Sequence, residues 1–413
     1  MKSTISSLRR GQRLGGPFWL TLPAIQGKVR RFEKRGIVYG DPAPRSRHRP
    51  GGSPMDIESL RQRIDEIDAR LVELLNTRAR CAMDVGKVKR ETGQASIYSP
   101  EREREVLEHV VSRNEGPLTD NTLIAIWKEM MSGSLSLEKA LKVAYLGPEG
   151  SFSHLAALKK FGQSVDLVAV RDISSVFDQV ARGADDYGIV PVENTTGGAV
   201  RDTMVCFLWV RGPVKVCAEM ALPIHQNLLS KTTLDRVQKV YSKPQVFDQC
   251  RQWLTTNCPQ ADRVAVGSTA EAALLASRVE GTAAIASSLA AEMYGLEVLS
   301  PAIEDNPQNQ TRFLVLGRES PGPTGRDKTC LLFSVLDKAG ALVEVLDVFR
   351  RCGINMTKIE SHPSPTKTWE YCFFVDIQGH AVDENVRQAL EKIRQHCRQL
   401  EVLGSFPVAV SAE

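Results

Sequence analysis

The sequence predicts a multidomain protein in which an all-helical segment precedes a two-lobed α/β segment and a smaller α+β segment. Apolar residues recur at helical spacing from about residue 57. From residue 142, short apolar runs alternate with helical stretches, which is typical of α/β domains. After residue 328 the order becomes β-α-β-β-α-β, which predicts a ferredoxin-like sandwich. The 413 residues, 42% of them hydrophobic, suffice for two or three cores.

Charge separates residues 1–54 from the remainder of the chain. This segment holds 12 Lys and Arg against 2 Asp and Glu, so the remaining residues have 41 against 47 and are mildly acidic. It could be a basic disordered extension, an Arg-rich targeting peptide, or sequence upstream of a true start at Met55. Bulk charge gives no argument for a nucleic-acid partner.

Nine scattered cysteines without a closely spaced pair favour a reducing compartment, and we expect a cytoplasmic protein. The same scatter argues against a metal site, and we expect no cofactor. The apolar patch at residues 18–20 is too short to span a bilayer, so no membrane association is expected.

Three cations mark the first helical stretch. Arg61, Arg78 and Lys89 are spaced 17 and 11 residues apart, and we interpret them as a cationic line suited to an anionic ligand. At about 1.5 Å per residue, Arg61 lies roughly 25 Å from Arg78 along a straight helix. If both bind one small molecule, two chains must build the site.

Two further helices are predicted downstream. Ser99 and Pro100 have the residue types of an N-cap and a first turn, followed by Arg102 and Glu103. A third amphipathic stretch over 122–141 carries polar side chains four residues apart, and therefore on one face. These side chains are Ser134 and Glu138.

In this order, these residues make 55–141 resemble the all-helical chorismate mutase family. The resemblance implies an intertwined homodimer that rearranges chorismate to prephenate without a nucleophile. It implies carboxylate binding by Arg78 and the partner's Arg61, and stabilisation of the ether oxygen by Lys89 and Glu138. Glu138 would have to be protonated to donate. The implied chorismate-binding residues are Arg61, Arg78, Lys89, Ser99, Arg102, Glu103, Ser134 and Glu138.

Polar loops follow several strands of the α/β segment, 142–318. The motifs are Gly-Pro-Glu-Gly-Ser-Phe at 147–152, Glu-Asn-Thr at 193–195, Pro-Gln at 244–245 and Thr-Arg-Phe at 311–313. Together they resemble prephenate dehydratase. The resemblance implies a periplasmic-binding-protein-like fold, and conversion of prephenate to phenylpyruvate with loss of carbon dioxide and hydroxide. It implies that Thr311 assists the departing hydroxyl, and that substrate contacts come from Ser151, Asn194, Thr195, Gln245 and Arg312.

A Pro- and Gly-containing linker over 319–327 leads to the last segment, 328–413. The loop 340–343 and the segment 360–363 resemble the amino-acid-binding ACT domain. The resemblance implies phenylalanine as effector. Relatives commonly have Arg where this chain has His362. The implied effector-binding residues are Gly340, Ala341, Leu342, Val343, Glu360 and Ser361.

The whole chain thus resembles bifunctional chorismate mutase/prephenate dehydratases of phenylalanine biosynthesis with feedback inhibition by phenylalanine. The expected assembly is a homodimer or a dimer of dimers. Two alternatives stay open from the sequence. The second site could take arogenate, the aminated analogue of prephenate, or the chain could be a non-catalytic amino-acid sensor with degenerate enzyme domains.

Overall fold

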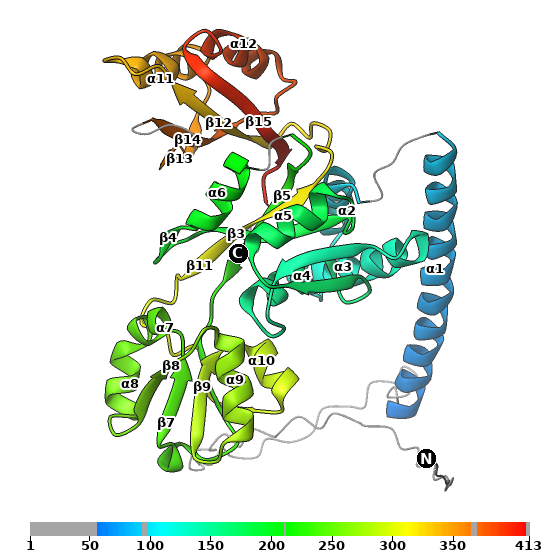
Figure 1. The fold of residues 1–413 in the computed structure, drawn as a ribbon. Helices are drawn as coiled ribbons and strands as arrows, with labels where there is room; N and C mark the ends of the chain where they lie inside the picture. Colours follow the sequence, from blue (N-terminus) through cyan, green and yellow to red (C-terminus); the bar gives the residue numbers. More distant parts are fainter. Residues whose placement is uncertain (1–55, 93–97, 210–211, 365–369, 410–413) are drawn as a thin grey trace, which may run out of the picture. The chain divides into compact units, whose positions relative to one another are not determined.

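The computed structural model describes residues 56–92, 98–209, 212–364 and 370–409 (Figure 1). The basic extension predicted over 1–54 lies outside these described residues. The chain divides into two compact units, Met1–Gln62 and Arg63–Glu413.

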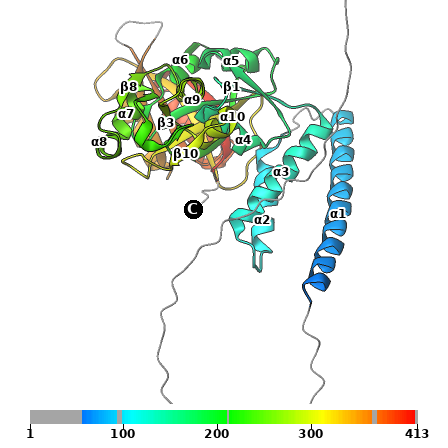
Figure 2. The same cartoon turned by 90° about the horizontal axis from the view of Figure 1, so that it is seen from below.

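Three helices form the first part of the described chain, and α2 and α3 lie side by side (Figures 1 and 2). The Ser99 hydroxyl accepts a hydrogen bond from the Arg102 N–H, which confirms the predicted N-cap ahead of Pro100. The third helix ends at Glu138 rather than at residue 141, because Leu141 is fully buried in the core of the following sheet. The helices are α1 (Ile57–Glu91), α2 (Pro100–Ser112) and α3 (Asp120–Glu138).

The first α/β lobe is a six-stranded sheet in the order β2-β1-β3-β11-β5, with β4 paired to β3. The first three strands in chain order run parallel, whereas β11 lies antiparallel between β3 and β5. The strands are β1 (Lys142–Leu146), β2 (Asp166–Val170), β3 (Tyr187–Asn194), β4 (Gly198–Ala199), β5 (Lys215–Pro223) and β11 (Gln310–Gly317). The helices of this lobe are α4 (Phe152–Phe161), α5 (Ile173–Ala181) and α6 (Arg201–Trp209).

The second lobe has its own five-stranded sheet, in the order β10-β6-β9-β7-β8. The chain enters this lobe after β5 and returns at β11, so the predicted two-lobed α/β architecture is confirmed. Its strands are β6 (Asn227–Ser230), β7 (Lys239–Ser242), β8 (Asp262–Ala265), β9 (Thr282–Ala286) and β10 (Glu297–Ser300). Its helices are η1 (Leu234–Arg236), α7 (Pro244–Gln249), α8 (Arg251–Asn257), α9 (Thr269–Arg278) and α10 (Ser288–Tyr294).

The C-terminal domain has the expected β-α-β-β-α-β order, with sheet order β13-β14-β12-β15. Alternate residues of a strand face opposite sides of the sheet. Phe333 therefore packs with the two helices, while its neighbour Leu332 packs against Phe207 of the first lobe. The elements are β12 (Asp327–Val335), α11 (Ala341–Arg351), β13 (Met356–Pro363), β14 (Tyr371–Gln378), α12 (Glu384–Ile393) and β15 (Cys397–Pro407).

Candidate functional sites

A cavity of about 350 Å³ lies among the three N-terminal helices and the end of α4. Apolar side chains such as Val85, Val106 and Leu135 form part of its wall. Seven of the eight residues predicted to bind chorismate line it. They are Arg78, Lys89, Ser99, Arg102, Glu103, Ser134 and Glu138.

Arg78 joins the first and third helices inside this cavity. Its Nη1 donates a hydrogen bond of 3.1 Å to the Ser134 hydroxyl, which donates to the Met130 carbonyl at 2.9 Å. Burial lowers the pKa of Arg78, and the nearby positive charge of Arg102 lowers it further. Two guanidinium groups so close together produce a positive potential that an anionic ligand would relieve.

Glu138 is positioned by a glycine that the sequence analysis did not single out. A Cβ at Gly86 would lie 2.4 Å from the Glu138 Cγ, so any larger residue there would force the Glu138 side chain to move. Glycine inside a helix costs about 1 kcal/mol relative to alanine. The close packing of Glu138 against Gly86 explains why a glycine occupies this helical position despite the cost.

Glu103 has a partner that comes from the α/β domain. Lys160 of α4 contacts its carboxylate at 3.0 Å, and the buried Tyr98 hydroxyl donates to the same oxygen at 2.5 Å. Burial raises the pKa of Glu103, but Lys160 and Tyr98 outweigh burial, and that pKa lies below its usual range. Lys128 and Lys160 also line the cavity, and the sequence analysis assigned neither. For Lys160, no helix-periodic signal relates it to a helical site 57 residues earlier.

Arg61 is the one predicted chorismate-binding residue that the structure does not place among the cavity-lining residues. Its exposed side chain lies 3.9 Å from Glu58. The 17 residues between Arg61 and Arg78 turn a helix by roughly 1700°, so the two face about 100° apart. The expectation of a single cationic line is therefore wrong at Arg61, whereas Lys89 returns to within about 20° of Arg78.

A second, larger cavity of about 1240 Å³ is lined by both α/β lobes. Thr311 of β11 and Asn194 of β3 face it from the first lobe, and Gln245 faces it from the first turn of α7. The cross-strand register pairs Thr311 with Asn194 directly. With Ser151, four of the six predicted prephenate-binding residues thus line one cleft.

The orientation of the Asn194 amide is fixed by its surroundings. Its oxygen accepts from the N–H groups of Thr196 and Gly197, at 3.0 and 2.8 Å. Its Nδ2 donates to the Thr311 hydroxyl at 2.9 Å and to Asn309 Oδ1 at 2.8 Å. Since Thr311 Oγ1 accepts there, its own proton can be donated elsewhere.

Asn309 is a further residue that sequence analysis did not assign. It is only 2% exposed and lines the cleft, and its Nδ2 has no hydrogen-bond partner in the described protein. A buried donor without a partner costs about 1–3 kcal/mol, which a cleft-bound acceptor would recover. Its place two residues before the Thr-Arg-Phe motif was the available signal.

Two predicted serine and threonine contacts serve the protein itself. The Ser151 hydroxyl caps α4 by accepting from the His154 N–H, and donates to the Leu146 carbonyl, although Ser151 does line the cleft. The Thr195 hydroxyl accepts from the Gln310 N–H at 3.0 Å, and Thr196 lines the cleft in its stead.

Arg312 departs from its predicted place. Its side chain is not among those that line the cleft, because strand alternation turns it to the opposite face from Thr311. There it contacts Glu219 at 2.7 Å and Asp376 of the C-terminal domain at 2.6 Å. The structure thus separates Arg312 from the other predicted substrate contacts.

A cavity of about 270 Å³ in the C-terminal domain contains four of the predicted effector contacts, Gly340, Ala341, Leu342 and Val343. Tyr371 and Phe373 of β14 add aromatic surface. Glu360 and Ser361 lie outside this cavity on the edge strand β13. His362 Nδ1 lies 3.0 Å from the Pro363 carbonyl oxygen.

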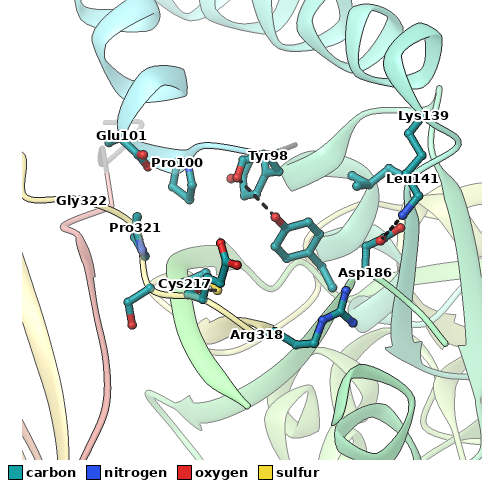
Figure 3. A pocket seen from close by; sticks show the side chains of 13 residues that line it. Tyr98, Pro100, Glu101, Lys139, Leu141, Asp186, Cys217, Arg318, Pro321 and Gly322 are labelled. Atoms are coloured by element: carbon teal, nitrogen blue, oxygen red, sulfur yellow. Dashed lines mark hydrogen bonds and ion pairs between the residues drawn. The ribbon is translucent and has the colours of Figure 1, made fainter. Parts of the chain in front are cut away.

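Figure 3 shows a further cavity, of about 210 Å³, where the start of α2 meets the segment after β11. It contains none of the predicted site residues. Two of its labelled polar groups bond to protein atoms: Lys139 to Asp186 at 2.7 Å, and the Cys217 thiol to the Glu319 carbonyl at 3.0 Å. Glu101 Oε2, in contrast, is buried without a hydrogen-bond partner in the described part of the chain.

The part of the chain that the structure describes holds neither a metal-ligating cluster nor a membrane-spanning helix. No cluster of metal-ligating side chains occurs among these residues, and the nine cysteines are free thiols. No helix in this part of the chain has both the length and the apolar character needed to cross a bilayer.

Three family models match consecutive parts of the chain: chorismate mutase type II over 60–139, prephenate dehydratase over 143–321, and ACT domain over 331–395. A bifunctional chorismate mutase/prephenate dehydratase of Pseudomonas aeruginosa is 45% identical over 360 residues, 86% of this chain and 98% of the relative.

Two solved structures share the fold of the α/β and C-terminal domains. A prephenate dehydratase of Arthrobacter aurescens in complex with L-Phe has a TM-score of 0.60 at 30% identity, and covers 66% of this chain and 94% of its own. GqqA, titled a quorum quenching acylase, has a TM-score of 0.59 at 28% identity, and covers 65% of this chain and 98% of its own. Because one fold can carry different activities, the polar groups of the site must decide the chemistry.

Three features define a multidomain enzyme with a regulatory module. They are a helical cavity with clustered cations, an α/β cleft with a Thr–Asn pair, and a C-terminal ACT domain. The chain belongs to the bifunctional chorismate mutase/prephenate dehydratase family. It therefore joins an isomerase and a lyase of phenylalanine biosynthesis in one polypeptide.

Proposed function

We propose that the two reactions take place in the two separate cavities, with chorismate bound among the helices and prephenate bound in the α/β cleft. The observation that carries this proposal is that each cavity gathers most of the polar residues implied for its own reaction. The nine free thiols favour a cytoplasmic setting.

In the helical cavity, Arg78 and Arg102 bind the carboxylates of chorismate in its compact reactive conformer. This is catalysis by orientation, because the rearrangement needs no covalent intermediate. Lys89 and protonated Glu138 donate to the ether oxygen as negative charge grows there in the transition state. The free lone pairs of Glu103 accept from the ring hydroxyl.

Arg61 completes this site from a partner subunit. An apolar stripe along α1 is exposed in the single chain, as a helix made for a second copy would be. Burying it would stabilise an intertwined homodimer by the hydrophobic effect. The exposed apolar residues of this helix are Ile57, Leu60, Ile64, Ile67, Leu71, Val72, Leu74, Leu75, Met83, Val85 and Val88.

In the α/β cleft, Thr311 donates its hydroxyl proton toward the departing ring hydroxyl of prephenate. The Asn194 amide donates a hydrogen bond to the Thr311 oxygen. The Thr311 proton therefore points away from Asn194. Asn309 Nδ2 and Gln245 bind substrate oxygens. Departure of hydroxide and carbon dioxide then produces the aromatic ring of phenylpyruvate.

Phenylalanine inhibits the second reaction from the ACT domain. Backbone N–H groups at the start of α11 hold its carboxylate, and the apolar side chains of Leu342 and Phe373 contact its ring. The dehydratase of Arthrobacter aurescens was solved with L-Phe, which supports this ligand.

Incubation of the purified protein with chorismate tests the assignment. The parent should release phenylpyruvate, whereas Thr311→Ala should accumulate prephenate, with dehydratase turnover reduced on the order of 10²-fold for one lost donor. Thr256→Ala, which removes an exposed threonine hydroxyl that donates to the Gln252 carbonyl within α8, is the matched control. Normal phenylpyruvate formation by Thr311→Ala would refute the role of Thr311. Turnover of arogenate but not prephenate would change the substrate, and absence of any turnover would favour a sensor.

A further inference from the structure

Six charged side chains form an ionic cluster between the first α/β lobe and the ACT domain. Arg312 is its centre: its side chain is 14% exposed and contacts Glu219 at 2.7 Å and Asp376 at 2.6 Å. Glu219 also contacts Lys328 at 2.8 Å. The α/β lobe contributes Arg312, Glu193 and Glu219, and the ACT domain contributes Lys328, Lys358 and Asp376.

The charges of the two domains are complementary. The lobe supplies one cation and two carboxylates, the ACT domain two cations and one carboxylate, so the cluster is neutral as a whole. Lys358, 10% exposed, is ion-paired with Glu193, whose other oxygen lies 3.8 Å from Arg312. The Glu193 side chain is 38% exposed, whereas the other five are largely buried, and buried charges are costly to leave unpaired.

Two strands connect this cluster to the cleft. The register pairs Thr311 with Asn194, and next to them Arg312 with Glu193. Because consecutive side chains point to opposite faces, the first pair faces the cleft and the second faces the ACT domain. The register shifts immediately after Arg312, so the pairing there is interrupted by a bulge.

We propose that Arg312 and Glu193 are positioning residues, through which Asp376 and Lys358 of the ACT domain hold the Thr311–Asn194 pair in its reactive geometry. This inference rests on the proposed role of the cleft in prephenate turnover. A strand is stiff over one residue, so a displacement of the ionic pair moves the neighbouring cleft pair with it. A misplacement of about 1 Å can cost on the order of 10²-fold in rate.

The test uses the full chain and compares Lys358→Met, Glu193→Gln and the double variant with the parent. Each single variant should lower kcat for prephenate by roughly ten- to a hundredfold, and the double variant should fall no further than the worse single, because one interaction is lost in each case. Lys358→Arg, which keeps the charge, should recover most of the activity. Chorismate turnover should stay at the parent level, since the helical cavity contains neither residue.

Lys338→Met is the matched control, because Lys338 forms an exposed ion pair with Glu344 in the same domain at 2.9 Å. It should leave kcat unchanged. Denaturant unfolding of each variant separates positioning from folding. Lower stability with parental kcat in Lys358→Met, or strictly additive losses in the double variant, would overturn the inference. A parent that forms no phenylpyruvate would instead refute the proposed function, before any variant is compared.

Discussion

The contact between Lys160 and Glu103 joins the α/β domain to the helical cavity, and its removal has a calculable effect. Both side chains are nearly buried, with 14% and 12% of their surface exposed. Lys160→Met keeps most of the apolar stem and removes the charge. Glu103 then remains in the cavity wall without its cation.

The size of the effect follows from the 3.0 Å separation of Lys160 Nζ and Glu103 Oε2. With an effective dielectric constant of about 20, Coulomb's law gives roughly 5 kcal/mol of attraction. Part of this offsets the desolvation of the lysine, and breaking such a buried pair typically costs about 3–5 kcal/mol. We therefore expect the free energy of unfolding to fall by about 3 kcal/mol at pH 7.

The pH dependence has a definite sign. In the parent, the pKa of Glu103 is lowered by folding, so its contribution to stability is present above the ordinary Glu pKa of about 4.3 and is lost as pH falls. In Lys160→Met, burial without the cation raises that pKa. The difference in unfolding free energy should therefore be largest near neutral pH and shrink as the solution is acidified below about pH 4.

Denaturant unfolding at pH 7 and pH 4, together with chorismate turnover at pH 7, measures these effects. Turnover should fall by roughly 10- to 100-fold, the scale of one hydrogen bond to a charged group. Lys159→Met is the control, because Lys159 is the exposed neighbour in the same helix. Equal stability of Lys160→Met and the parent at pH 7, or equal losses in both variants, would refute the reasoning.

Three further predictions follow from the proposed sites. Arg61→Ala and Arg78→Ala should each abolish mutase activity. Equal mixing of the two variants with full subunit exchange should restore about a quarter of the parental number of active sites, since half of the dimers are mixed and one of the two sites in each mixed dimer is intact. No recovery would exclude a shared site. Mutase activity should fall as pH rises, because an ionised Glu138 cannot donate a hydrogen bond, and Glu138→Gln should flatten this profile; superimposable profiles would remove Glu138 from the mechanism. Gly340 has φ +82° with open space around it, so Gly340→Val acts through backbone strain and should weaken inhibition by phenylalanine. Gly353→Val, equally open at φ +66°, is the control and should leave inhibition unchanged. Equal inhibition curves for Gly340→Val and the parent would place the effector elsewhere.

Local sequence signals determined most element boundaries. Helix α11 spans 341–351, where its apolar period and the glycine before it agree. The Ser99 cap was readable for the same reason, since the capping contact reaches only three residues along the chain. Errors of a few residues occurred where tertiary burial decides the boundary, as at the end of α3.

The sequence by itself also indicated most of the polar residues that line the two larger cavities, where their motifs resemble those of known enzymes. It could not assign Lys160 to the helical site or separate Arg312 from the cleft. The alternation of side chains along β11 is visible in the sequence. Which face of β11 lines the cleft, however, depends on which domain covers the opposite face of the strand. The ACT domain supplies that cover through Asp376, 64 residues further along the chain. Contacts at such separation have no local periodicity, so only the packed domains decide them.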